Sequence, residues 1–350
     1  MVLSEQPNDI CILRLSAIGD VCHAVSAVQA IQRHYPKAKI SWVIGKVEAA
    51  LLEGLPGVEL VIFDKKQGIS AYQKLRKTFK HKQFDVLLHM QVAFRANLVA
   101  RCIPAKVKVG FDWHRAKEAH SLFINQSIEK QQQPHVLEGF MGFAQAIGVP
   151  DAAPQWQLPI SDSNSAVAVQ YLDGLGKTLA IAPAASGTER NWLPERYAEV
   201  ARHAHNQGFS IVLTGGPTEL EQCLADEIMQ YIDFPVLNLV GKTSLKELLC
   251  LLEQASLVIA PDTGPAHMAV TVGTPVIGLY AHSNPARTGP YLYQDYVLEV
   301  YHQNLKQQYG KTADKLPWGR RVKGVNLMEQ ITSESVIAMF DRVVEEQKLV

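Results

Sequence analysis

Short apolar runs alternate with helical patterns along almost the whole chain, and this alternation limits the fold more than any other feature of the sequence. Apolar runs bounded by turn residues are typical of strands buried on both faces. Helical segments between such strands indicate parallel sheets that are covered by helices. The expected strands lie at 10–15, 40–44, 60–63, 86–89 and 107–110, and then at 179–182, 210–214, 236–239, 257–260 and 276–280. We therefore expect an α/β protein with two doubly wound sheets.

A proline-rich stretch separates the two series of strands. Residues 148–159 read GVPDAAPQWQLP, with three prolines and little periodicity, as expected of a linker. A length of 350 residues also favours two domains. We expect an N-terminal Rossmann-like domain at 1–152, a C-terminal one at 153–330, and a last helix at 331–350 that packs back on the N-terminal domain. Two such domains should move relative to each other when a ligand binds.

Charge and cysteine content exclude several classes of protein. Lys and Arg number 34 and Asp and Glu number 34, so the formal net charge is zero and the whole chain has no field for non-specific nucleic-acid binding. The five cysteines form no C-x-x-C pair, which favours reduced thiols in a cytoplasmic protein. The N-terminus lacks the apolar run of a signal peptide, and no window is apolar enough to span a membrane.

The first candidate site is the loop after the first expected strand. It contains Gly19, which permits a tight turn, and Asp20, which stands at the start of a helix. Asp20 is either a helix N-cap or a side chain that serves as a base or accepts a hydrogen bond from a hydroxyl. The loop lacks G-x-G-x-x-G, so the sequence gives no support for a nicotinamide cofactor.

The most informative segment is 260–269, which reads APDTGPAHMA and lies between a strand and a helix. Small residues at such a turn let backbone N–H groups approach a ligand, and the positive helix end favours a pyrophosphate. His267 could add a side-chain donor. The alternative is an ordinary helix cap followed by a core histidine.

Two further loops at strand ends carry charged side chains. Arg190 offers a planar fork for phosphate oxygens, or is a solvated arginine. Glu221 follows the turn Gly215-Gly216, where a carboxylate would suit a ribose diol, although glutamates are also common at helix starts.

Taken in order, these motifs resemble the ADP-heptose:lipopolysaccharide heptosyltransferases of glycosyltransferase family 9, and are most similar to the heptosyltransferase I type. The resemblance covers nearly the whole chain and rests on SAIGDVCHAVSAVQAI, GFDWHRAKEAHSLF, ERNW, GGPTELE, KTSLKELLCLL and DTGPAHMA. It implies a GT-B fold, in which two Rossmann-like domains face each other across a cleft. It also implies an inverting transfer of L-glycero-D-manno-heptose from ADP-heptose to Kdo of the lipopolysaccharide inner core, with Kdo-lipid A as acceptor.

The resemblance also implies roles for individual residues. Asp20 matches the general base, and Arg190 takes the position of a lysine that contacts the donor phosphates. Ser186 stands near the positions of two threonines in the family. Ala185 lacks the hydroxyl that one of these threonines would supply. The remaining donor-binding residues are Asp262, then Thr263, Gly264 and His267 for the pyrophosphate, Glu221 for the ribose and the backbone of Thr243 for the adenine; Gly19, Lys117 and His135 lie on the acceptor side. No cofactor besides the donor substrate, and no metal, is implied.

Positive charge is concentrated in one part of the chain. Residues 65–117 contain 13 Lys or Arg and only two acidic residues, Asp85 and Asp112. This is either a solvated helix face or a surface for an anionic glycolipid.

We expect a peripheral protein on the cytoplasmic face of the inner membrane that does not act on nucleic acid. The polar and basic segment 304–323 is expected to be a mobile loop, and no role follows for it.

Two alternatives remain open at this point. One is a family 9 relative that adds a later heptose or uses another nucleotide sugar. The other is a non-enzymatic module that binds polyanions through two nucleotide-type domains. The second alternative predicts binding that is sensitive to salt and insensitive to Asp20→Asn. The presence of both Asp20 and the DTGPAH loop argues against it.

Overall fold

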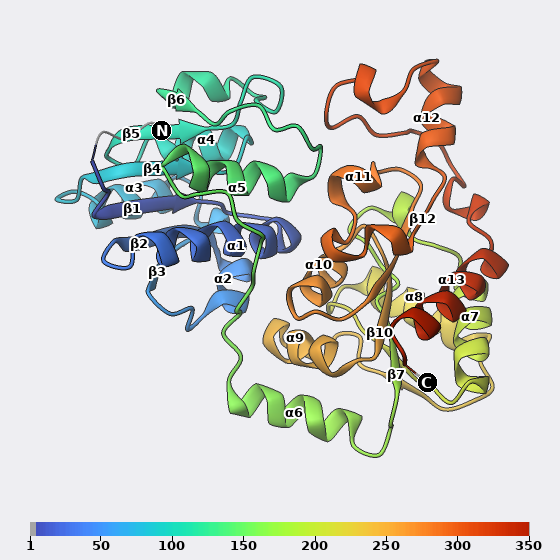
Figure 1. Cartoon of the computed structure of the whole chain (residues 1–350). Helices are drawn as coiled ribbons and strands as arrows, with labels where there is room; N and C mark the ends of the chain where they lie inside the picture. Colours follow the sequence, from blue (N-terminus) through green and yellow to red (C-terminus); the bar gives the residue numbers. More distant parts are fainter. Residues whose placement is uncertain (1–4, 350) are drawn as a thin grey trace. The chain divides into compact units, whose positions relative to one another are not determined.

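The computed structural model describes residues 5–349, which form two compact units, one reaching to Pro159 and the other beginning at Ile160 (Figure 1). Each unit contains one six-stranded sheet in which all neighbouring strands run parallel. The expected α/β class with two doubly wound sheets is therefore confirmed. Within the described residues, no helix is both long and apolar enough to cross a membrane.

The N-terminal sheet has the strand order β3-β2-β1-β4-β5-β6. Its strands are β1 (Asp9–Leu13), β2 (Lys39–Gly45), β3 (Val58–Phe63), β4 (Phe84–His89), β5 (Ala105–Gly110) and β6 (Gln126–Ser127). The helices of this unit are α1 (Ile18–His34), α2 (Lys46–Leu52), α3 (Ile69–Thr78), α4 (Phe94–Ala100) and α5 (Val136–Ala146), with short 3₁₀ turns at Lys65–Gln67 (η1) and His120–Phe123 (η2).

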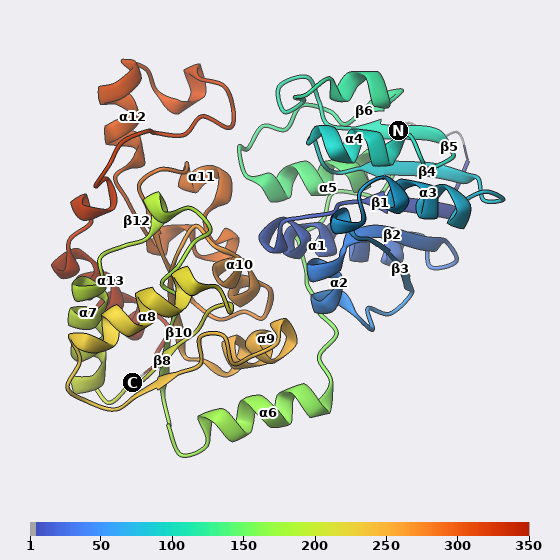
Figure 2. The same cartoon turned by 180° about the vertical axis from the view of Figure 1, so that it is seen from behind.

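Strand β1 lies in the middle of this sheet and is buried on both faces, because helices cover both sides of the sheet. Cys11 and Leu13 pack with side chains of α3 and α4 in one core cluster. Ile10 and Ile12 alternate with them along the strand and therefore face the opposite side. Helices α1 and α5 pack against each other and lie in front of the sheet in Figure 1. Helices α3 and α4 lie in front of it in Figure 2, which shows the opposite side.

The C-terminal sheet repeats the same order as β12-β11-β10-β7-β8-β9. Its strands are β7 (Thr178–Ile181), β8 (Ser210–Leu213), β9 (Val236–Asn238), β10 (Leu257–Pro261), β11 (Val276–Tyr280) and β12 (Val297–Glu299). The helices are α6 (Asp162–Leu172), α7 (Pro194–Asn206), α8 (Glu219–Gln230), α9 (Leu245–Gln254), α10 (Gly264–Thr271), α11 (Pro285–Thr288), α12 (Tyr301–Tyr309) and α13 (Ser333–Glu346). One core cluster joins this sheet to α7, α8 and α13, and another joins it to α6 and α9.

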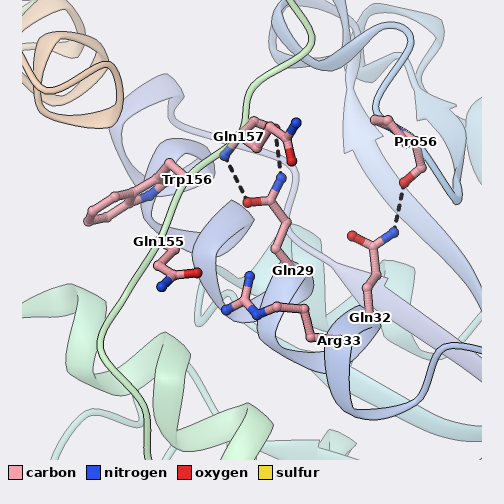
Figure 3. Close-up of a pocket in the computed structure, with 7 residues that line it drawn as sticks. All are labelled: Gln29, Gln32, Arg33, Pro56, Gln155, Trp156 and Gln157. Carbon is pink, nitrogen blue, oxygen red and sulfur yellow. Dashed lines mark hydrogen bonds between the residues drawn. The ribbon is translucent and has the colours of Figure 1, made fainter.

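The boundary between the units lies later than the sequence suggested, because the linker is attached to the N-terminal unit. Gln29 of α1 donates to the carbonyl oxygen of Gln157 over 2.6 Å and accepts from its N–H group over 2.9 Å. The indole N–H of Trp156 donates to the carbonyl oxygen of Cys22 over 2.9 Å. Figure 3 shows the hollow beside this attachment. It is lined by Gln29, Gln32, Arg33, Pro56, Gln155, Trp156 and Gln157.

The C-terminal part contains two helices, α12 and α13, in the region of the last expected helix and of the segment 304–323. Helix α13 packs against α7 and β11 of its own unit, where Phe340 contacts Phe209. The apolar spacing of α13 matches the face that this contact buries. The segment 304–323 is not one loop, because it begins inside α12, which buries Tyr301 and Leu305.

In each sheet, the order in which the chain adds strands reverses between the two central strands, β1 and β4 in the first sheet and β7 and β10 in the second. The chain builds outward from β1 to β3 and then crosses to β4 on the other side of β1, and the second sheet does the same around β7 and β10. Loops leaving the carboxyl ends of such strands diverge and leave room for a ligand. The loops after β1, β4, β7 and β10 are therefore the places where functional side chains are expected.

Candidate active site

Asp20 lies in the first turn of α1, directly after β1, with its side chain about one-third exposed. The N-cap of this helix is Ala17, so the interpretation of Asp20 as an N-cap is wrong. Asp20 instead sits at the third helical position, and its carboxylate accepts from the Ala17 N–H group over 3.4 Å. Gly19, beside it, is buried within the same turn. The carboxylate is therefore held at the carboxyl end of the sheet while it remains open to solvent.

Arg14 fixes this carboxylate to the centre of the sheet. Its guanidinium forms an ion pair with Asp20 and donates to the carbonyl oxygen of Met90 over 2.6 Å. Only 11% of the Arg14 side chain is exposed, and the guanidinium lies 5.3 Å from the centre of the Phe140 ring. Gln91, after β4, accepts from the Leu15 N–H group over 2.8 Å. Side chains that follow the ends of β1 and β4 thus set the geometry around Asp20.

The other two acceptor-side candidates have different surroundings. Lys117 is exposed in the loop after β5 and lines a hollow of about 600 Å³ together with Trp113. His135 is buried, and its Nδ1 accepts from the Leu137 N–H group over 3.1 Å as the N-cap of α5. Its ring meets that of His23 on α1 edge to face, with 5.2 Å between centroids. His135 therefore caps a helix next to the one that carries Asp20, whereas Lys117 faces open space.

A buried network that the sequence did not predict holds the loop that carries Lys117. His89 and His120 both donate to the side-chain oxygen of Asn97, over 2.9 and 3.0 Å, and the second nitrogen of His120 accepts from the Phe111 N–H group over 3.1 Å. The amide of Asn97 donates to the carbonyl oxygen of Glu118 over 2.8 Å. Both rings are neutral in this arrangement. Burial lowers the pKa of His89 to about 3 and that of His120 to about 4.

In the C-terminal unit, the loops after β7 and β10 meet through Arg190. Its guanidinium donates to the carbonyl oxygen of Asp262 over 2.6 Å and to the hydroxyl of Ser186 over 2.8 Å. The Asp262 carboxylate lies 3.5 Å from the same guanidinium and 3.8 Å from Nε2 of His267. The hydroxyl of Thr263 donates to the carbonyl oxygen of Ala184 over 3.1 Å. These contacts join Ser186, Arg190 and the 262–267 turn into one site.

The charge of Asp262 is fixed by its neighbours. Burial by itself would raise the pKa of this carboxyl, but the nearby His267 and Ser283 side chains and the charge of Arg190 hold it at about 2. Asp262 is therefore an anion at any physiological pH. A permanent anion that touches both Arg190 and His267 orients these two side chains and does not exchange protons with a substrate. Ser283 lies after β11, in a segment to which the sequence analysis assigned no role.

The N-terminus of α10 follows this cluster directly. Its N-cap, Thr263, makes no side-chain cap hydrogen bond within the helix, and Gly264 and Pro265 begin the first turn. The first N–H groups of a helix have no partner inside it and carry partial positive charge. Together with the Arg190 guanidinium, they form a site suited to an anion.

Glu221 and Thr243 lie at the ends of the next two strands. Glu221 is in the first turn of α8, and its carboxylate accepts from the Gly216 N–H group over 2.7 Å and from the Thr218 hydroxyl over 2.6 Å. Thr243 is half-buried and precedes Ser244, the N-cap of α9. The Gly241 N–H group donates to the carbonyl oxygen of Gly215 over 3.1 Å, which joins the two loops. Among the described residues, no group of His, Cys, Asp and Glu side chains is arranged to hold a metal ion.

Comparison with known proteins shows the family to which the chain belongs. The sequence model of glycosyltransferase family 9 (heptosyltransferase) matches residues 72–318. The lipopolysaccharide core heptosyltransferase OpsX of Haemophilus influenzae is 45% identical over 341 residues, which cover 97% of this chain and 98% of that protein. Lipopolysaccharide heptosyltransferase 1 of Escherichia coli is 26% identical over 313 residues, which cover 85% of this chain and 95% of that protein.

Solved structures show the same fold at lower sequence identity. A family 9 glycosyltransferase from Veillonella parvula superposes with a TM-score of 0.79 at 21% identity, covering 97% of each chain. The E. coli heptosyltransferase WaaC with ADP superposes with a TM-score of 0.70 at 21% identity, covering 98% of this chain and 100% of that one. From the match over most of its length, the chain is a member of glycosyltransferase family 9, the heptosyltransferases, with the two parallel α/β units of the GT-B fold.

Proposed function

We propose that this enzyme transfers L-glycero-D-manno-heptose from ADP-heptose to a hydroxyl of Kdo in the lipopolysaccharide inner core, with Kdo-lipid A as acceptor. The acceptor oxygen attacks the anomeric carbon of the heptose, the bond from that carbon to the ADP oxygen breaks, and the configuration inverts. Asp20 takes the proton of the attacking hydroxyl. ADP leaves with the added negative charge on its terminal phosphate.

The order of the strands supports the assignment of the donor. In the sequence β10-β7-β8-β9, the anion site of Arg190 and the α10 N-terminus comes first, Glu221 comes next and Thr243 comes last. A nucleoside diphosphate laid along this edge meets the groups that it needs in the order of its own parts: diphosphate, ribose and base. This single correspondence carries the proposal of an ADP-sugar donor.

Charge on the leaving group is compensated by groups already in place. Arg190 is held as a two-pronged donor by Ser186 and by the carbonyl oxygen of Asp262. His267 and the N–H groups of the first turn of α10 add further donors. Donors fixed before the reaction stabilise developing charge more effectively than mobile ones. Asp262 supports this arrangement through its fixed negative charge.

The role proposed for Asp20 follows from its position and its partner. It is the partly exposed carboxylate at the end of the central strand of the N-terminal sheet, and Arg14 fixes its direction. General-base assistance typically contributes about 10²–10⁴ in rate. Asp20→Asn should therefore lose about that factor in kcat, while the affinity for ADP-heptose stays within about twofold because the proposed donor groups lie in the other unit.

The test is release of ADP from ADP-heptose with three acceptors: Kdo-lipid A, the same acceptor already carrying one heptose, and none. Turnover that requires Kdo-lipid A and is lost in Asp20→Asn supports the proposal. Turnover only with the heptosylated acceptor supports addition of a later heptose instead. Tight binding of another nucleotide sugar, and weak binding of ADP-heptose, would overturn the assignment of ADP-heptose as the donor.

Because the acceptor is a membrane glycolipid, we also propose that the enzyme works on the cytoplasmic face of the inner membrane.

A further inference from the structure

Large apolar side chains stand exposed on one part of the N-terminal unit. Trp113 is 87% exposed and Leu122 is 81% exposed, on either side of Lys117 in the loop after β5. Phe94, at the start of α4, is 52% exposed, and Leu98, one turn later, is 37% exposed. Exposed apolar groups that gather in one place on a protein surface indicate a binding surface rather than chance exposure.

Hydrogen bonds bring these side chains to the same place. The Phe94 N–H group donates to the side chain of Glu118, and the amide of Asn97 donates to the Glu118 carbonyl oxygen. Helix α4 contacts the 3₁₀ turn η2, which contains Leu122. Trp113 lines the hollow of about 600 Å³ that is formed by this same loop. The buried network of His89, Asn97 and His120 supports the loop from below, so the exposed groups are presented from a fixed base.

Positive charge surrounds the apolar groups. Arg95 and Arg101 on and after α4 are exposed, as is Lys117 between Trp113 and Leu122. Helix α3 shares one core cluster with α4 and exposes three further basic side chains, Lys74, Arg76 and Lys77, and Lys80 is exposed just after the helix ends. Across residues 65–117 there are 13 Lys or Arg and two acidic residues. Each of these two carboxylates is paired with a basic side chain: Asp85 with Lys106, and Asp112 with Arg115.

We propose that this surface, which we define as the docking face of Phe94, Arg95, Leu98, Trp113 and Leu122, binds an anionic lipid bilayer. Aromatic side chains favour the headgroup region, leucine and phenylalanine favour the acyl boundary, and each nearby Lys or Arg is attracted to an anionic surface. Nucleic acid would also attract the basic groups, but it offers nothing to bury an exposed leucine. The inference rests on the proposed function in one respect: docking would bring the loop that carries Lys117 to the surface where a glycolipid acceptor lies.

The first test measures binding to vesicles by co-sedimentation. The variant is Phe94→Ser with Leu122→Ser, and the matched control is Val169→Ser with Val325→Ser, at two positions of the C-terminal unit that are 55% and 88% exposed. We expect the wild type and the control to bind vesicles containing phosphatidylglycerol, more weakly as salt rises, and the docking-face variant to bind at least about tenfold more weakly. Equal binding by variant and wild type, or equal binding to pure phosphatidylcholine, would overturn the proposal.

The second test separates docking from catalysis. Heptose transfer is measured with a soluble Kdo acceptor that lacks acyl chains and with Kdo-lipid A in vesicles. The docking-face variant should match the wild type on the soluble acceptor and lose activity only on vesicles. An equal loss on both acceptors would overturn docking, as would tighter wild-type binding to a single-stranded oligonucleotide than to vesicles. If the wild type turns over no acceptor while the vesicle result holds, the proposed function fails and the docking face stands.

Discussion

Arg190 and Asp262 are joined twice, since the Arg190 guanidinium donates to the main-chain carbonyl oxygen of Asp262 over 2.6 Å and lies 3.5 Å from its carboxylate. The two residues come from the ends of neighbouring strands β7 and β10. The side chains of both are largely buried, at 14% and 13% exposure. The position of the cation in the proposed diphosphate site therefore depends on the anion and the backbone of the opposite loop.

Replacing Arg190 should weaken binding of ADP. Arg190→Ala removes the guanidinium and leaves the Asp262 carboxylate without its closest cation, so we expect a loss of about tenfold to a hundredfold in ADP affinity, as for other charge-assisted hydrogen bonds. Arg190→Lys keeps the charge but not the two-pronged geometry, and should retain part of the affinity. Calorimetric titration with ADP measures both. Arg342→Ala, at an arginine about half exposed on α13, is the control and should bind as the wild type does. Unchanged affinity in Arg190→Ala would remove this residue from the site.

Replacing Arg14 should affect turnover and not donor binding. Arg14→Met keeps the length of the buried side chain but removes the ion pair to Asp20 and the hydrogen bond to the Met90 carbonyl oxygen. Loss of a fixed direction for Asp20 should lower kcat by about tenfold, equivalent to about 1.4 kcal/mol. Steady-state kinetics at saturating donor and acceptor give kcat, and calorimetry gives the ADP affinity. Arg33→Met, at an exposed position at the end of α1, serves as the control. A fall in ADP affinity with kcat intact would show that Arg14 acts elsewhere.

Replacing Glu221 should weaken the binding of the nucleoside part of ADP and leave the binding of its diphosphate part unchanged. Its carboxylate accepts from the Gly216 N–H group and from the Thr218 hydroxyl, and it is assigned to the ribose. Glu221→Ala should weaken ADP binding by about tenfold through the loss of a hydrogen bond to a charged group, and leave inhibition by inorganic pyrophosphate unchanged. Competition assays with both inhibitors measure this. Glu219→Ala, at an exposed residue two positions earlier on α8, should change neither. An equal effect on both inhibitors would mean that the loop, and not the ribose contact, had been damaged.

Most strands could be predicted because they contain apolar runs, and the central strands, such as β1, β7 and β10, are buried in parallel sheets. Strands β6 and β12 were missed because they contain two and three residues and lie at the edges of their sheets. The boundary between the units was placed too early because proline content marks a linker but not what the linker touches. The paired hydrogen bonds between Gln29 and Gln157 join residues far apart in sequence, and no local pattern signals them.

The candidate site was predictable to the extent that its residues follow strands. The loops that contain Asp20, Arg190 and the 262–267 turn each begin directly after an apolar run, so these loops could be placed at the ends of strands. What could not be predicted is that Arg190 reaches Asp262, since this depends on β7 lying beside β10. The network of His89, Asn97 and His120 was also missed, because its members come from a strand, a helix and a 3₁₀ turn with no shared spacing.

That network makes the stability of the protein depend on pH. Both histidines have an ordinary pKa near 6.5, and burial lowers it in the folded state to about 3 for His89 and about 4 for His120. Above pH 6.5 both rings are neutral in the folded and the unfolded chain, so they cause no difference. As pH falls below 6.5, the unfolded chain takes up protons that the folded chain does not, and the free energy of unfolding decreases by up to about 1.4 kcal/mol per pH unit for each histidine.

Removing one of these titrating groups should flatten the pH dependence. His89→Gln keeps a side-chain N–H donor for Asn97 but cannot be protonated in the unfolded chain. Between pH 7 and pH 5, the free energy of unfolding of this variant should therefore fall by about 2 kcal/mol less than that of the wild type, since one histidine with an unfolded pKa near 6.5 accounts for that amount. Urea unfolding of the full chain at several pH values measures it. His81→Gln, at an exposed histidine, should follow the wild-type curve. A His89→Gln curve parallel to the wild type would mean that the buried ring is protonated as readily in the folded chain as in the unfolded one.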